Sequence, residues 1–105
     1  MRRREVRKML SMLAQCRTVG ERVEVTVSDI SCRGCRIAPG AVSLAAGKVV
    51  VLRPAGMEGI TGIVRWCSDK GIGVEFDYPL HPAVVDHLCS LHPDEVTPIS
   101  MGFAA

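Results

Sequence analysis

A β-hairpin is predicted by residues 60–76, which read ITGIVRWCSDKGIGVEF. Residues 60–66 alternate between two faces, and residues 68–71 have the composition of a turn. Residues 73–76 then supply the partner strand. The alternation places Trp66 on the buried face, so we expect it to be a core residue.

Strand patterns continue towards the N-terminus of this hairpin. Residues 23–27 alternate valine with polar side chains, residues 34–37 fit a short strand that ends before Pro39-Gly40, and residues 48–52 are rich in valine. Residues 9–17 fit helical spacing at least as well as strand spacing. The β-rich context downstream favours a strand there.

One helix is expected near the C-terminus, over residues 81–92. Pro82 is tolerated in a first helical turn, and Pro93 ends the helix. The apolar side chains predicted to pack on the barrel are Val84, Val85, Leu88 and Leu91. The predicted fold class is mainly all-β: a small six-stranded antiparallel β-barrel with a C-terminal α-helix.

Composition indicates one globular domain. The 105 residues are 48% hydrophobic and 23% charged, and the apolar runs are too short for membrane insertion. Aromatic residues make up only 4%, which disfavours a stacking surface for nucleic acid. Five cysteines are an odd number, and the apolar stretch at residues 9–14 is too short for an export signal. We therefore expect free thiols and a cytoplasmic protein.

Positive charge is concentrated at the N-terminus. Residues 1–8 carry five basic side chains and one acidic side chain, whereas residues 9–105 carry eight basic and ten acidic ones. Such a distribution suits a compact anion better than a long nucleic acid. We divide the chain into a flexible basic arm (1–8), a barrel with its helix (9–92) and a C-terminal tail (93–105).

Two short motifs are candidates for a binding site. Arg3 and Arg7 form an R-x-x-x-R spacing, and guanidinium groups bind phosphates and guanine edges and stack on flat rings. Asp29, Ser31 and Gly34 form D-x-S-x-x-G, which combines acceptors, a hydroxyl donor and an open backbone in a loop after a strand. Taken singly, a solvated basic tail and a plain turn explain these motifs more simply.

Together the two motifs resemble the PilZ domain, a bacterial receptor module for cyclic di-GMP. The hairpin ending in Gly73-Val74-Glu75-Phe76 extends the resemblance, which covers most of residues 2–90. The resemblance implies a six-stranded barrel with its ligand bound outside. It also implies that Arg3 and Arg7 bind the phosphates and contact guanine. Asp29 and Ser31 would then recognise a guanine edge and a phosphate, and Gly34 would keep the surface open. Arg2 and Arg4 would add positive charge.

The implied function is a cyclic di-GMP receptor or adaptor that acts through an unidentified protein effector. Its output would be motility, surface attachment or exopolysaccharide production, without enzymatic activity or a cofactor, in a monomer or weak dimer. Because the arm begins almost at residue 1, we expect no rotation of a preceding domain. The alternative is a PilZ-like interaction module that binds no nucleotide. Asp86, on the predicted helix, is expected to take no part in binding.

Metal and redox chemistry are weaker candidates. Cys32 and Cys35 form one C-x-x-C, which is half of a tetrahedral zinc site, and the other cysteines and the histidines lack ligand spacing. No pattern typical of a catalytic triad or phosphate loop is present. We expect no metal, and we interpret several cysteines as small core residues.

Overall fold

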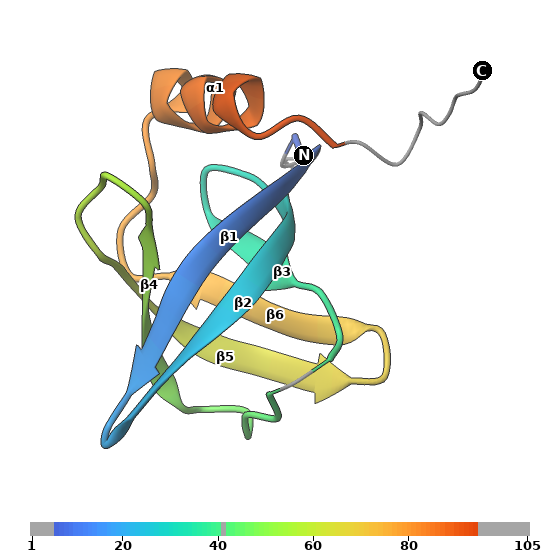
Figure 1. Cartoon of the computed structure of the whole chain (residues 1–105), viewed down its shortest axis with the longest axis vertical. Helices are drawn as coiled ribbons and strands as arrows, with labels where there is room; N and C mark the ends of the chain where they lie inside the picture. The colour runs from blue at the N-terminus through green and yellow to red at the C-terminus, as the bar shows by residue number, and fades with distance from the viewer. Residues whose placement is uncertain (1–5, 41, 95–105) are drawn as a thin grey trace, which may run out of the picture.

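The computed structural model describes residues 6–40 and 42–94 and forms a barrel with one helix (Figure 1). The predicted fold class is confirmed. The elements in chain order are β1 (Lys8–Thr18), β2 (Glu21–Ile30), β3 (Gly34–Ile37), β4 (Val49–Pro54), β5 (Ile60–Ser68), β6 (Gly71–Phe76) and α1 (Pro82–Leu91). Strand β1 begins at Lys8, the last residue of the expected arm. Arg2, Arg3 and Arg4 lie outside the described residues.

The six strands close into a barrel in the order β1-β2-β3-β6-β5-β4. Every neighbouring pair is antiparallel, and β1 completes the circle by pairing with both β2 and β4. In Figure 1, β1 and β2 cross in front of β5 and β6, and α1 lies over one end of the barrel. The inward-facing side chains form a single apolar core.

Strand β1 settles the ambiguous stretch at residues 9–17. Its buried side chains are every second residue, namely Leu10, Met12, Ala14 and Cys16. Met9 and Leu13, which a helix would bring close to these residues, are 54% and 57% exposed. A period of two is the signature of a strand with one buried face, so the strand prediction is confirmed.

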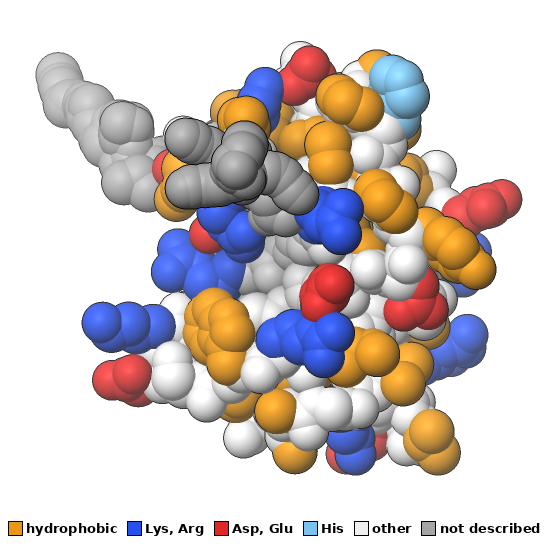
Figure 2. Space-filling model, turned by 180° about the vertical axis from the view of Figure 1, so that it is seen from behind, with side chains coloured by type: hydrophobic (Ala, Val, Ile, Leu, Met, Phe, Trp, Pro, Cys, Tyr) orange, Lys and Arg blue, Asp and Glu red, His pale blue; other side chains and the backbone are white. Residues whose placement is uncertain are grey.

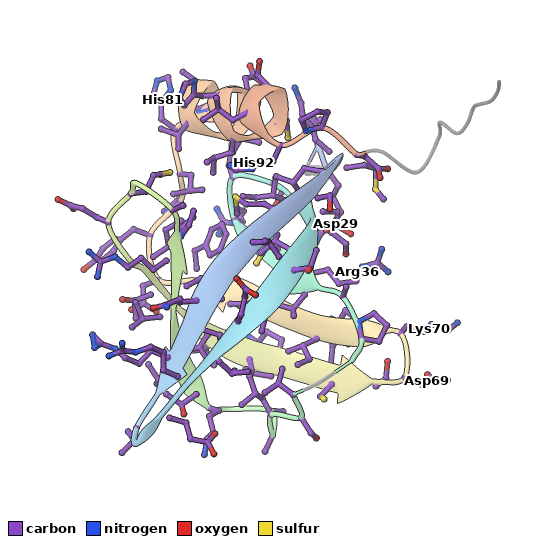
Figure 3. The ribbon with its side chains drawn as sticks, viewed as in Figure 1. Asp29, Arg36, Asp69, Lys70, His81 and His92 are labelled. Atoms are coloured by element: carbon purple, nitrogen blue, oxygen red, sulfur yellow. The ribbon has the colours of Figure 1, made fainter. Side chains whose placement is uncertain are left out.

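Helix α1 is one residue shorter at each end than predicted, and the histidines at the predicted limits cap it (Figure 3). His81 precedes the helix, and its Nδ1 accepts a hydrogen bond from the backbone N–H of Ala83 at 2.9 Å. At the other end, the backbone N–H of His92 donates to the carbonyl of Leu88 at 3.0 Å. In the described part of the chain, no helix is long and apolar enough to cross a membrane.

The buried face of α1 is narrower than the sequence predicts. Val85 and Leu88 are buried, and Val84 is half-buried. Leu91 is 58% exposed, so its prediction as a core residue is wrong. Leu91 is the last residue of the helix, and an apolar side chain there follows the helical period without reaching the barrel.

Candidate ligand-binding site

A bulge in β2 aims Asp29 at the outside of the barrel. The register between β2 and β3 shifts after Val27, which leaves Ser28 as an extra residue before Asp29 pairs with Arg36. Strict alternation from Val27 would have turned Asp29 inward and Ile30 outward, but Ile30 is buried in the core. A bulge re-aims side chains in this way. Asp29 therefore belongs to β2, which corrects its predicted place in a loop.

Asp29 is held between two arginines from different elements. Arg7, just before β1, donates from Nη2 and Nε to Oδ1 of Asp29 at 2.8 and 3.2 Å. Arg36, on β3, places its Nε 3.2 Å from Oδ2. The carboxylate side chain is only 11% exposed. A buried carboxylate needs charged or hydrogen-bonding partners, and here each oxygen has an arginine.

Ser31 and Gly34 build the turn between β2 and β3. Ser31 is fully buried, and its hydroxyl accepts a hydrogen bond from the backbone N–H of Arg33 at 3.2 Å. Its own N–H donates to the carbonyl of Gly34 at 2.8 Å. A Cβ at Gly34 would lie 2.3 Å from the carbonyl oxygen of Val74 on β6. The barrel itself therefore requires glycine at this position, because the two strands approach too closely for a side chain.

Trp66 lies on the outer wall of the barrel, which corrects its prediction as a core residue. A second bulge, between Val64 and Trp66, shifts the register of β5 against β6 and turns the indole outward. Trp66 is 41% exposed and covers Gly73, where a Cβ would lie 2.1 Å from the indole Nε1. One face of the indole thus rests on the glycine.

A hollow of about 160 Å³ lies beside Trp66 on this outer wall. It brings Arg7 and Gly34 of the predicted site together with cationic side chains that the motifs do not include. Its lining residues are Arg7, Arg33, Gly34, Cys35, Arg65, Trp66, Gly73, Val74 and Glu75. Arg65 pairs with Glu75, with 2.6 Å between Nε and Oε1. The hollow therefore combines guanidinium groups with an aromatic wall, the chemistry that suits a flat anion.

Positive charge predominates around the site. Arg7, Arg33, Arg36 and Arg65 lie around the hollow or on Asp29, against the carboxylates of Asp29 and Glu75. Figure 2 shows one face of the molecule, on which Lys and Arg side chains are interspersed with acidic ones. Guanidinium groups bind phosphates bidentately, so the arrangement can accept an anionic ligand.

A second contact ties the start of β1 to the helix. Lys8 pairs with Asp86 of α1, and the backbone N–H of Ser11 donates to the carbonyl of His92 at 3.0 Å. The hydrogen bond and the charge of Asp86 raise the pKa of Lys8. Asp86 therefore contacts the residue next to Arg7, and its expected lack of a role in ligand binding stays a prediction.

The cysteines show no metal-site geometry. Among the described residues, no three His, Cys, Asp or Glu side chains are grouped so as to hold a metal ion. Cys35 of the C-x-x-C is buried in the core, while Cys32 is half-buried. Burial raises the pKa of the Cys35 thiol to about 12, and the charge of Asp29 acts in the same direction. A thiol this weakly acidic is a poor nucleophile and metal ligand at neutral pH.

Sequence reasoning missed Arg36 and Trp66 as members of this site. Arg36 follows Gly34 by two residues, but its contact with Asp29 depends on the register between β2 and β3. Trp66 had a usable signal, because it lies opposite Gly73 across the predicted hairpin. An aromatic side chain opposite a glycine often covers that glycine on one face of a sheet.

The barrel is closed and six-stranded, and an arginine-rich hollow lined by Trp66 lies on the outside of its wall. These features place the chain in the class of small β-barrel domains with an external polar site. The chain belongs to the PilZ domain family, because the family model described as "PilZ domain" matches residues 1–91. No curated protein matches the chain.

The fold is also similar to that of a solved structure, the complex of K. pneumonia MrkH with c-di-GMP. The two chains are 20% identical with a TM-score of 0.55, and the match covers 87% of this chain and 51% of MrkH. The chain thus spans about half the length of that protein. At this identity the likeness concerns the barrel fold.

Proposed function

We propose that this protein is a receptor for cyclic di-GMP. The observation that carries the proposal is Asp29, a nearly buried carboxylate on the outer wall that lies between arginines and beside a cationic hollow. Membership of the PilZ family and the fold shared with a protein solved with c-di-GMP support the choice of ligand. A cyclic dinucleotide has two phosphates and two flat bases, which call for cations and stacking surfaces.

In this proposal each site residue has a distinct task. Arg3 and Arg7 bind the phosphates, and Arg2 and Arg4 add positive charge. Asp29 accepts from the ring N–H and the exocyclic amine of guanine, a pair of donors that adenine lacks. Ser31 holds the turn that presents Arg33, and Gly34 keeps the wall open beside the hollow. Trp66 adds a flat surface for a base.

Arg7 gives this receptor two states. Without ligand, Arg7 donates to Oδ1 of Asp29. Binding of a phosphate draws its guanidinium away and leaves Oδ1 for the guanine edge. The arm of residues 1–8 then covers the wall of the barrel. A partner protein can sense the ligand only if it binds these two surfaces with different affinities, and its response is no larger than that difference.

The proposal includes an output through protein contact and not through catalysis. An unidentified effector would read the covered surface and regulate motility, attachment or exopolysaccharide production. We also propose that the receptor acts in the cytoplasm, as a monomer or weak dimer, and needs no cofactor.

Calorimetric titration with cyclic di-GMP tests the ligand. We expect saturable binding and much weaker binding of cyclic di-AMP. Asp29→Ala should lower the affinity for cyclic di-GMP at least about tenfold, because charge-assisted hydrogen bonds are lost. Glu24→Ala is the matched control: it removes an exposed carboxylate from the same strand and should leave binding unchanged.

The second candidate function is a PilZ-like protein-interaction module without a nucleotide. One observation favours it: Asp29 and the hydroxyl of Ser31 already have partners within the protein. No heat of binding and no shift in melting temperature with cyclic di-GMP would support this function and contradict the receptor proposal.

A further inference from the structure

The two arginines on Asp29 differ in how firmly the protein holds them. Arg7 belongs to the segment that precedes β1, and its side chain is 47% exposed. Arg36 belongs to β3, faces Asp29 across the β2–β3 ladder, and is 33% exposed. Figure 3 shows Asp29 and Arg36 on the same side of the barrel. One partner of the carboxylate precedes the first strand, and the other is part of the barrel wall.

The bulge residue fixes Arg36 further. The Nε of Arg36 donates to the hydroxyl of Ser28 at 3.3 Å, and that hydroxyl lies 3.3 Å from the carbonyl oxygen of Arg36. Ser28 is the extra residue that re-aims Asp29. The same local irregularity therefore presents the carboxylate and holds the arginine beside its Oδ2.

We propose that Arg36 is a positioning residue for base recognition, which keeps the Asp29 carboxylate oriented and charge-compensated when Arg7 leaves to bind a phosphate. This inference rests on the proposed cyclic di-GMP function. A buried carboxylate without a partner is strongly unfavourable. Because Arg36 remains next to Oδ2, the Asp29 carboxylate still has a cationic partner after Arg7 has left.

Orientation matters because a guanine edge presents two donors at a fixed spacing. The terminal torsion of an aspartate is broad, so the carboxylate turns easily unless a neighbour holds it. A carboxylate has about four lone-pair positions, and one contact to Oδ2 leaves room for both guanine donors. Arg36 therefore selects an orientation without occupying the carboxylate.

Paired titrations with cyclic di-GMP and cyclic di-IMP test this role. The inosine analogue lacks only the exocyclic amines, so the ratio of the two dissociation constants reports how well the amine is recognised. We expect the wild type to prefer cyclic di-GMP about tenfold, as for one charge-assisted hydrogen bond. Arg36→Ala should reduce this preference to about one, and Arg36→Lys should retain part of it.

Arg22→Ala is the matched control, because it removes an exposed arginine from the opposite end of β2. It should leave both affinities unchanged. A merely structural role for Arg36 would weaken both ligands equally and preserve their ratio, which would overturn the inference. Equal affinities in the wild type would overturn it too.

The failure of the proposed function is distinguishable from these results. A wild-type protein that binds neither dinucleotide overturns the receptor proposal, and this inference with it. Binding by the wild type, with an undiminished preference in both Arg36 variants, overturns the inference alone. If Arg36→Ala fails to fold, Arg36→Lys decides, because only the positioning role predicts a reduced ratio in a folded protein that retains the charge.

Discussion

Arg7 and Lys8 are neighbours in sequence, and each contacts an aspartate, but the two aspartates have very different surroundings. Asp29 lies on the barrel wall, is 11% exposed and has a second arginine. Asp86 lies on the helix and is 62% exposed. An exposed ion pair gains little because water screens it, whereas a buried carboxylate depends on its partners. Burial therefore decides which of the two contacts affects the stability of the folded protein.

The largest expected effect is the loss of both arginines from Asp29. Arg7→Ala or Arg36→Ala alone leaves one partner, and we expect each to lower the free energy of unfolding by about 1 kcal/mol. The double variant leaves a buried carboxylate without a cation and should lose about 3 kcal/mol or more. Urea denaturation of the four proteins measures this non-additivity.

The exposed Lys8–Asp86 pair is the control for this set of denaturation measurements. Lys8→Ala, Asp86→Ala and their double variant should unfold at the same urea concentration as the wild type. Adding Asp29→Asn to the Arg7→Ala/Arg36→Ala variant removes the buried charge and should recover stability. If the double variant loses only the sum of the two single losses in free energy of unfolding, then Arg7 and Arg36 do not jointly neutralise the Asp29 carboxylate.

Ligand binding should distinguish the neighbouring residues next. Arg7→Ala should weaken the binding of cyclic di-GMP by about 1–3 kcal/mol, and Arg3→Ala by a similar amount, because each loses a charge-assisted contact to the ligand. Lys8→Ala should bind like the wild type, since its ammonium group is engaged with the helix. Calorimetry on the three variants measures the difference. Equal losses at Arg7 and Lys8 would indicate general attraction by the arm.

The smallest effect concerns alkaline pH. The buried Cys35 thiol, with a pKa of about 12, stays protonated in the folded state while the unfolded thiol ionises from about pH 9. The folded state then binds more protons, so stability falls as pH rises, by up to about 1.4 kcal/mol per pH unit. Unfolding measured between pH 9 and 10 should show a shallower decline in Cys35→Ala than in the wild type.

Lys8 supplies the contrasting titration. Because the pKa of Lys8 is raised in the folded state, the contribution of its pair with Asp86 to stability is complete below pH 10.5 and is lost only as pH rises further. Lys8→Ala should therefore leave the slope between pH 9 and 10 unchanged. A slope that depends on Lys8 and not on Cys35 would contradict the assignment to the buried thiol.

Regular alternation made most of the fold predictable. The valines of residues 23–27 and the short segment 34–37 before Pro39-Gly40 identified β2 and β3, and the two prolines that flank residues 83–92 delimited α1. The spacing of Asp29, Ser31 and Gly34 also identified the turn around which the site is built. These features are local, so they can be read from one stretch of chain.

The bulges in β2 and β5 explain what alternation did not predict. Beyond Val27 in β2 and beyond Val64 in β5, an extra residue exchanges the inner and outer faces. Whether a strand forms a bulge depends on its pairing with neighbouring strands, which a single segment does not contain. Trp66 was therefore predicted inside the core, and the contact between Asp29 and Arg36 was missed.

Closure of the barrel limits how this protein can recognise another protein. Each of the six strands already has a hydrogen-bonded neighbour on both sides. Proteins with a free sheet edge often capture a peptide by adding it as one more strand, with affinity from the main chain and specificity from alternate side chains. Where the described strands are paired on both sides, that mode has no template in the wall. A partner that docks on this part of the barrel would be recognised through surface side chains, so its affinity would depend on the particular residues exposed there.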